Sequence, residues 1–148
     1  GLAAALLLGA EGVLLGTRFL ASTEAPLPER YKQVIIASDG HDTLLTEIPD
    51  IATGRVWPGA YSRVVRNRLI EEWCGREGEL RYRRGEVLAR TQQAREAGDP
   101  SYGALFIGQT AGLIASIEPA ATIVERVVAE AEALLRQRAP ALLDSAIS

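Results

Sequence analysis

The residues with the clearest capacity for chemistry are Gly16 and Thr17, which follow a short apolar run, Val13 to Leu15. Glycine lets the backbone come close to a ligand, and threonine offers a hydroxyl and a backbone amide. The composition of Thr17 to Ala21 predicts that a short helix starts here. Because free N–H groups at a helix N-terminus attract anions, this turn is a candidate phosphate cradle. A simpler interpretation is that Gly16 makes a turn and Thr17 caps a helix.

Two other reactive side chains lack partners in the sequence. His41 lies in the polar run Asp39 to Asp42, and no serine or cysteine nucleophile stands with it in a recognised motif, so a surface-loop position is predicted. Cys74 follows Trp73 at a predicted helix end and is interpreted as a partly buried free thiol. A single cysteine forms no internal disulfide, and one cysteine with one histidine makes no four-ligand zinc site. We therefore expect no metal site and no catalytic residue in this segment.

Composition limits the partners of the chain. With 148 residues, 47% of them hydrophobic and 24% charged, it has the balance of one globular domain. The net charge of −3 gives no general attraction for nucleic acid or anionic lipid. An arginine-rich stretch includes Arg81 to Arg84, but glutamates are interleaved with it, which favours a solvated helix surface. Neither a nucleic acid nor a membrane is expected as a partner.

The opening apolar run, Leu2 to Ala10, raises the possibility of a signal peptide. No Lys or Arg precedes the run, and Glu11 and Gly12 divide it well short of the ~18 residues that span a bilayer. The alternative is a short buried helix, Leu2 to Leu8, followed by the buried strand Val13 to Leu15. A helix that leads into a strand suggests an α/β fold. A cytoplasmic location is expected by default, because no targeting signal is found and one free thiol is present.

The elements of the remaining sequence are predicted from hydrophobic periodicity and from Gly and Pro positions. They are an amphipathic helix at 29–38 with Tyr31, Val34, Ile35 and Ala37 inward, a strand at 43–48, a loop at 49–61, and helices at 62–73 and 77–97. A last helix starts at Pro119 and ends at Pro140, and its inward face is expected to comprise Val124, Val127, Val128, Ala131, Leu134 and Leu135. The loop contains Trp57 and Tyr61 and is expected to pack against the fold or a ligand mouth. The run Tyr102 to Ile114 contains three glycines, which suggest close backbone packing or a ligand edge.

The order of these motifs resembles the late barrel of nitronate monooxygenases, also called 2-nitropropane dioxygenases. The two most specific blocks are Leu15-Gly16-Thr17-Arg18-Phe19-Leu20 and Gly108-Gln109-Thr110-Ala111-Gly112-Leu113. The similarity continues through Tyr31-Lys32-Gln33, Arg66-Asn67-Arg68, Gly98-Asp99-Pro100 and the helix after Pro119. It covers nearly the whole chain.

The resemblance implies an FMN-dependent enzyme that oxidises alkyl nitronates with O2 to a carbonyl compound and nitrite. In this family the flavin phosphate is held at the end of the last barrel strand, onto which Leu14, Leu15, Gly16 and Thr17 fall. Leu14 stands where the family often has Gln, so only its backbone could serve the flavin. The family's catalytic histidine, in an Ala-Gly-Gly-His type motif, has no counterpart in this sequence.

The expected fold class is α/β, as the C-terminal portion of a TIM (β/α)₈ barrel with a mainly helical insertion. A complete barrel needs at least about 200 residues, so we expect an incomplete barrel that is mostly helical in this segment. The expected division is a last barrel helix, strand and phosphate-binding turn at 1–22, an insertion at 23–115, and a closing helix and tail at 116–148. Because the chain has no Met and opens at Gly1 inside a predicted helix, a fragment that is inactive alone is expected.

Two alternatives stay open. FMN-dependent enoyl-acyl-carrier-protein reductases resemble the same barrel and share the Gly-Thr-Arg-Phe block. Alternatively, the chain is a non-catalytic helical interaction module that binds a protein partner through its arginine-rich helices and the Trp57 loop. An apolar opening strand without partner strands would leave exposed edges in such a module.

Overall fold

The computed structural model describes residues 1–138 and 140–141. The described chain is mostly helical, as expected, with one small sheet. Its elements are α1 (Leu2–Leu7), α2 (Thr17–Leu20), α3 (Glu29–Ala37), β1 (Thr43–Thr46), α4 (Ile48–Thr53), β2 (Ser62–Val65), α5 (Arg68–Trp73), α6 (Glu77–Glu96), the 3₁₀-helix η1 (Gln109–Leu113), α7 (Ala120–Ala133) and the π-helical turn η2 (Leu134–Arg138).

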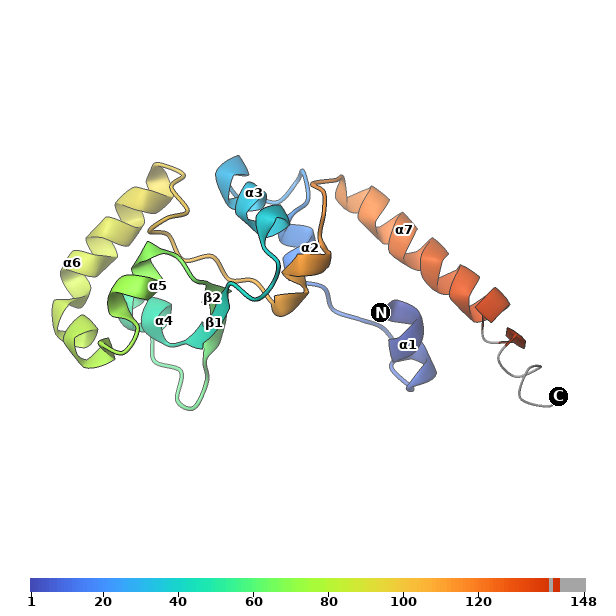
Figure 1. Cartoon of the computed structure of the whole chain (residues 1–148), viewed down its shortest axis with the longest axis horizontal. Coiled ribbons are helices and arrows are strands. Elements are labelled where there is room, and N and C mark those ends of the chain that lie inside the picture. Colours follow the sequence, from blue (N-terminus) through green and yellow to red (C-terminus); the bar gives the residue numbers. More distant parts are fainter. Residues whose placement is uncertain (139, 142–148) are drawn as a thin grey trace.

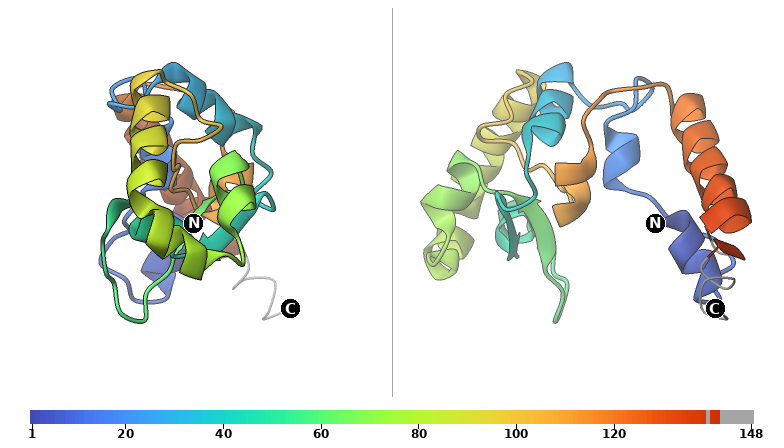
Figure 2. Two further views of the ribbon diagram at one scale, coloured as in Figure 1. Left: turned by 90° about the vertical axis from the view of Figure 1, so that its left-hand side faces the viewer. Right: turned by 45° about the vertical axis from the view of Figure 1, so that its right-hand side comes forward.

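The elements are arranged along an extended molecule (Figure 1). The hairpin gathers with α4, α5 and α6 at one end, while α2, α3 and η1 occupy the middle. At the other end α1 contacts α7, and the second view in Figure 2 shows the two side by side. Residues distant in sequence therefore meet in the middle, which is where Gly16 and Thr17 lie.

The first segment differs from the sequence prediction in two respects. The predicted helix at Leu2 to Leu8 is not buried, since Ala3 is its one buried residue and Leu7 and Leu8 are exposed. The helix α1 forms and ends before Gly9, whose φ of +94° suits glycine. The predicted buried strand Val13 to Leu15 is wrong, because these residues form no ladder and Leu14 is 97% exposed. A strand needs a hydrogen-bonded neighbour, and no part of the described chain pairs with this stretch.

The hairpin and α4 correct two further predictions. β1 pairs antiparallel with β2, from Thr43 opposite Val65 to Thr46 opposite Ser62, so residues 62–65 are strand and the predicted helix starts only at Arg68. The adjacent Val64 and Val65 suit a strand, and β-branched residues are stiff there. The first part of the predicted loop forms α4, with Pro49 in its first turn and Gly54 in the left-handed region at its end.

The long helix α6 packs on α4 and α5 around the larger of two apolar clusters. Leu80 and Val87, seven residues apart on α6, are fully buried and so lie on one face of the helix. Trp73 at the end of α5 is the largest of the fully buried side chains. The cluster comprises Ile48, Ile51, Ala52, Val64, Leu69, Ile70, Trp73, Leu80, Val87, Ala94 and Tyr102.

A second apolar cluster joins α3 and η1 to the residues after α2. Tyr31 and Ile35 of α3 point inward as expected, whereas Ala37 is exposed and Lys32 is buried instead. The glycine-punctuated run supplies close backbone packing here. A Cβ at Gly112 would lie 2.4 Å from the Asp39 carbonyl oxygen, so only glycine fits without a shift.

The last helix is confirmed, and its predicted packing is confirmed in part, since Ala131 is buried as expected. Pro119 precedes α7, and Ile123 and Ala131 are buried. Val124 and Val128, predicted to face inward, are about half exposed. The predicted tail falls beyond the described residues from 142 onward. No helix of the described chain is both long and apolar enough to cross a membrane.

Candidate functional site

A short helix starts at Thr17, as the composition of this segment predicts, and Gly16 precedes it. Gly16 is the N-cap of α2, and its carbonyl oxygen accepts the N–H groups of Phe19 at 3.0 Å and Leu20 at 3.2 Å. The amides of Gly16, Thr17 and Arg18 donate to no other group within residues 1–138 and 140–141. Three adjacent donors are therefore available to a ligand, as at the start of any helix.

Leu14 and Leu15 precede this turn and differ in exposure. Leu14 is 97% exposed, and Leu15 is 40% exposed. An exposed leucine side chain offers neither donor nor acceptor, so only the backbone of these residues could contact a polar ligand. Of the four predicted residues, Gly16 and Thr17 lie at the start of α2, and Leu14 and Leu15 lie in the irregular segment that precedes it.

Thr17 connects the two sequence blocks on which the resemblance rests. Its Oγ1 accepts the backbone N–H of Gly108 at 2.9 Å. As an acceptor in this bond, the hydroxyl retains its own proton for donation to another group. The Gly-Gln-x-Ala-Gly block, which follows 91 residues later, is therefore placed directly against the Gly-Thr turn.

Arg18 is directed away from the turn. Its Nη1 donates to the Ser116 carbonyl oxygen at 2.9 Å, and its Nη2 lies 3.4 Å from Oε2 of Glu118. Glu118 also accepts a hydrogen bond from Arg126 at 2.9 Å and one from the Ser116 hydroxyl. The hydrogen bond from Arg126, followed by that from Ser116, lowers the pKa of Glu118 to about 2. Arg18 therefore ties α2 to the segment before α7.

Two further charged side chains fix the chain after α2. The buried Lys32 ammonium donates to the carbonyl oxygens of Ser22 at 2.7 Å and Thr23 at 3.2 Å. The Glu24 carboxylate accepts the N–H of Ala120 at 2.9 Å, at the start of α7. A carboxylate at a helix N-terminus is favourable, because it satisfies a free donor and complements the helix dipole. The segment after α2 is thus held to α3 by Lys32 and to the start of α7 by Glu24.

The two reactive side chains that the sequence analysis set aside lie on the surface. His41 is exposed, and its backbone N–H donates to Asp39 Oδ1 at 2.8 Å in a turn. Cys74 is exposed rather than partly buried, because it caps the C-terminus of α5 just before Gly75 turns the chain. The part of the chain described by the structure contains no group of three or more His, Cys, Asp or Glu side chains that could hold a metal ion.

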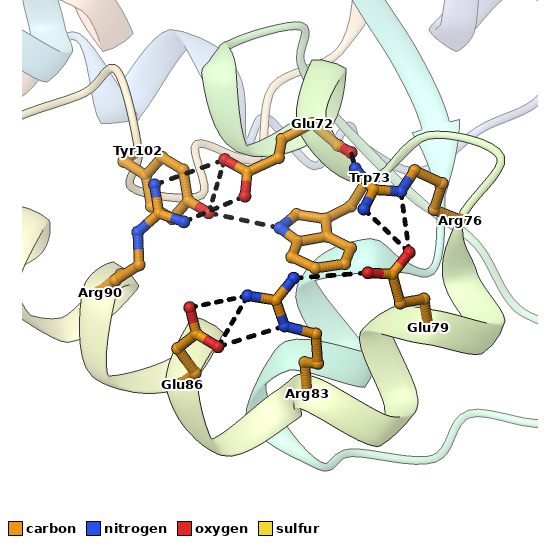
Figure 3. A network of polar contacts seen from close by, with 8 residues as sticks. All are labelled: Glu72, Trp73, Arg76, Glu79, Arg83, Glu86, Arg90 and Tyr102. Carbon is orange, nitrogen blue, oxygen red and sulfur yellow. Dashed lines mark hydrogen bonds and ion pairs between the residues drawn. The ribbon is translucent and has the colours of Figure 1, made fainter.

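The arginine-rich stretch is organised into a polar network on α5 and α6 (Figure 3). Arg76 and Arg83 both pair with Glu79, and Arg83 pairs with Glu86. Their guanidinium groups lie 4.9 Å and 5.6 Å from the Trp73 ring. These arginines therefore cover the largest core side chain, in the manner of cation–π contacts.

The same network closes around Glu72. Arg90 pairs with Glu72 at 3.0 Å and lies 4.0 Å above the Tyr102 ring. Trp73 Nε1 donates to the Tyr102 hydroxyl at 3.3 Å, and that hydroxyl donates to Glu72 at 3.1 Å (Figure 3). Burial raises the pKa of Glu72, but the hydrogen bonds from Arg90 and Tyr102 outweigh it, so the pKa is lowered. The network positions the end of α5 on α6.

Sequence reasoning missed the residues that position the turn. The motifs include Arg18 and Lys32 without giving either a role, and no motif includes Glu24 or Glu118. Lys32 follows the inward-facing Tyr31 and precedes Ile35 by three positions, which is the one sequence signal that it lies near the buried face of α3. The partners of Arg18 and Glu24 lie about a hundred residues away, and periodicity does not detect such contacts.

Comparisons with known proteins identify the family of the chain. A family model described as nitronate monooxygenase matches residues 1–130. Over 91% of its length the chain is 36% identical to nitronate monooxygenase npaC of Metarhizium robertsii, and over 93% it is 32% identical to a nitronate monooxygenase of Neurospora crassa. It covers 39% and 36% of these proteins, so it spans under two fifths of their length.

Solved structures give the fold. FabK from Thermotoga maritima matches with a TM-score of 0.73 and 32% identity, over 91% of this chain and 41% of that one. The nitroalkane oxidase from Streptomyces ansochromogenes matches with a TM-score of 0.68 and 29% identity, over 90% of this chain and 37% of that one. Both are TIM-barrel enzymes, so the chain has the fold of part of such a barrel with a mainly helical addition. The chain belongs to the nitronate monooxygenase family.

Proposed function

We propose that the protein containing this chain is an FMN-dependent nitronate monooxygenase that oxidises alkyl nitronates with O2 to a carbonyl compound and nitrite. Membership of the family supports the reaction class. The chain's own part would be to hold the flavin phosphate with Leu14, Leu15, Gly16 and Thr17. We likewise propose the division at 1–22, 23–115 and 116–148, and a cytoplasmic location consistent with the single exposed thiol of Cys74.

The turn fits a phosphate group in three respects. A Cβ at Gly16 would have no other heavy atom within 4 Å, so the space over the turn is open. The amides of Gly16, Thr17 and Arg18 supply donors, and the Thr17 hydroxyl retains a proton. Arg18 is committed to Ser116 and Glu118, so the phosphate would be held by backbone donors and the hydroxyl.

The bond between Thr17 and Gly108 is the observation on which the proposal chiefly depends. It fixes the orientation of the hydroxyl, since one lone pair is used by the Gly108 N–H. Bound FMN would supply the redox chemistry, as cofactors do in flavoenzymes. The residues described here would bind and orient the cofactor, and we assign no proton transfer to His41.

Replacing Thr17 tests this function. In the protein that contains this chain, we expect Thr17→Val to weaken FMN binding about tenfold or more, because a hydrogen bond to a charged group contributes roughly 1.5–3 kcal/mol. Thr17→Ser keeps the hydroxyl and is expected to bind FMN nearly as well as the wild type. Thr91→Val on α6, whose hydroxyl donates to the Leu88 carbonyl oxygen, is the control. Unchanged FMN affinity in Thr17→Val would refute the phosphate site.

A second candidate rests on the likeness to FabK, a related flavoenzyme. The alternative activity is that of an FMN-dependent enzyme similar to enoyl-acyl-carrier-protein reductases. Nitronate-dependent oxygen uptake with nitrite release distinguishes the first candidate from enoyl-thioester-dependent oxidation of NAD(P)H. Both candidates share the FMN site, so the Thr17 variants test the site whichever reaction is found.

A further inference from the structure

A cavity of about 380 Å³ lies in the insertion, between α4, the loop 54–61 and α6. Asp50 and Ile51 of α4 form one wall and Arg81 and Arg84 of α6 another, while Trp57 and Tyr61 border it from the loop. We name this hollow the insertion cavity. It belongs to the lobe at the far end of the molecule from α1 and α7 in Figure 1, whereas the Gly16 turn lies in the middle.

The loop that borders the insertion cavity is held by two turns. Gly54 ends α4 at φ +72°, and Gly59 has φ +73°. The Ala60 N–H donates to the Trp57 carbonyl oxygen at 3.1 Å, so residues 57–60 form a turn with Pro58 and Gly59 in the positions that a type II turn favours. The indole of Trp57 nevertheless remains 63% exposed. A fixed loop thus presents an uncovered aromatic surface at the cavity.

Both carboxylates in the cavity wall already have partners. Glu47 Oε1 pairs with Arg81 Nη2 at 2.6 Å. Asp50 is buried and accepts the hydroxyl of Ser62 at 3.2 Å. The negative charges of the wall are therefore directed to groups of the protein itself.

Two arginines that line the cavity, unlike Arg81, have no acidic partner among the described residues. Among the described residues, Arg55 and Arg84 form no ion pair and no side-chain hydrogen bond. The Nη1 of Arg84 lies beneath the turn, 3.2 Å from where a Cβ at Gly54 would stand. The cavity is therefore lined both by two arginines without an acidic partner and by the aromatic residues Trp57 and Tyr61, on a chain whose net charge is −3.

We propose that the insertion cavity binds a small organic anion with an aromatic body, such as an aryl phosphate or an aryl carboxylate. The planar guanidinium groups of Arg55 and Arg84 match the paired oxygens of such an anion. The indole of Trp57 and the phenol ring of Tyr61 offer flat apolar surfaces to its ring. The site is independent of the flavin-phosphate turn, since it shares no residue with it.

Calorimetric titration of the whole chain with phenyl phosphate tests the proposal. We expect saturable binding in the millimolar range or tighter, weaker binding of inorganic phosphate, and no measurable binding of neutral benzyl alcohol. Arg55→Gln and Arg84→Gln are each expected to weaken phenyl phosphate binding about threefold to fivefold, in line with the strength of partly exposed ion pairs. Arg95→Gln, on the same α6 but outside the cavity, is the matched control and leaves the affinity unchanged.

The aromatic contribution has its own variant. Trp57→Ala is expected to weaken phenyl phosphate about threefold or more while leaving inorganic phosphate unaffected. Far-ultraviolet circular dichroism of the helices reports whether each variant is folded. Absence of saturable phenyl phosphate binding, or equal affinities in wild type, Arg55→Gln and Arg84→Gln, would overturn the proposal. Because FMN affinity is measured separately through the Thr17 variants, failure here leaves the flavin site untouched.

Discussion

Single side chains hold the segments around the Gly16 turn in place through contacts that cannot be predicted from the sequence. Gly16 and Thr17 could be predicted as a candidate anion site because their types and the following helix start are local features. The bond from the Gly108 N–H to Thr17 could not be predicted from spacing, since it depends on how η1 packs against α2. The same holds for Lys32, whose buried ammonium needs the carbonyl oxygens of Ser22 and Thr23.

Gly112 is expected to tolerate no side chain. Gly112→Ala would place a Cβ 2.4 Å from the Asp39 carbonyl oxygen, so we expect a loss of about 1–3 kcal/mol in the free energy of unfolding. Gly85→Ala is the contrasting variant, because Gly85 lies within α6 with no atom near its Cβ position. It is expected to stabilise by about 0.5–1 kcal/mol. Urea denaturation measures both, and a loss of stability in Gly85→Ala or none in Gly112→Ala would contradict this packing.

Glu118 is expected to make the free energy of unfolding fall at acid pH. Its pKa is lowered in the folded chain to about 2 by hydrogen bonds from Arg126 and Ser116. A lowered pKa means that the stabilisation is present above the ordinary carboxyl pKa and is lost as the pH falls toward 2. We expect Glu118→Gln to lose less stability than the wild type between pH 5 and pH 2.5, measured by urea titration at each pH. Glu125→Gln on α7 is the control, and equal acid sensitivity in Glu118→Gln and wild type would contradict the assignment.

At the level of elements, hydrophobic patterning predicted most helices but missed α4, and it predicted one of the two strands of the described chain, since the predicted strand at 43–48 forms β1. The helices α3, α6 and α7 were found because apolar residues recur on one face or caps punctuate them. β2 was predicted as helix because Val64 and Val65 also suit a helical face, and only pairing with β1 decides between the two. The strand at Val13 to Leu15 was wrong for the opposite reason, since its composition suits a strand but the described chain offers no neighbour.

Asn67 illustrates how one side chain joins two elements. Its Oδ1 caps α5 by accepting the Ile70 N–H, and its Nδ2 donates to the carbonyl oxygens of Pro100 and Gly103 at 2.8 Å. We expect Asn67→Ala to lower the free energy of unfolding by about 1–3 kcal/mol, because it removes the cap and leaves two acceptors without a partner. Asn67→Asp keeps the cap acceptor but places a carboxylate oxygen against the two carbonyl oxygens that Nδ2 contacts, so a loss at least as large is expected. A wild-type urea midpoint in Asn67→Ala would contradict both roles.

For the molecule as a whole, the family was predictable from motif order, whereas the packing of the ends was not. The expected inward face of α7 leaves Val124 and Val128 about half exposed, and Leu7 and Leu8 at the end of α1 are more exposed still. These residues lie on the two helices that contact one another at one end of the molecule (Figure 2). Sequence patterning reports which residues are apolar, and it does not report what covers them.

These exposed side chains give a prediction for the 148-residue chain alone. We expect it to bind the dye ANS and to release it when Leu8 and Val128 are both replaced by Gln, because exposed apolar surface is what the dye detects. Trp57→Gln, which removes an exposed aromatic side chain elsewhere, is the control and is expected to reduce the signal less. Equal dye binding in wild type and the double variant would locate the exposed apolar surface elsewhere.

The most direct test of the proposed function is the reaction of the protein containing this chain with an alkyl nitronate under air. We predict nitronate-dependent uptake of O2 and release of nitrite by an FMN-loaded protein, and loss of both when Thr17→Val weakens FMN binding. Bound FMN with no nitrite release, together with oxidation of NAD(P)H that depends on an enoyl thioester, would contradict the monooxygenase assignment and favour the reductase-like alternative.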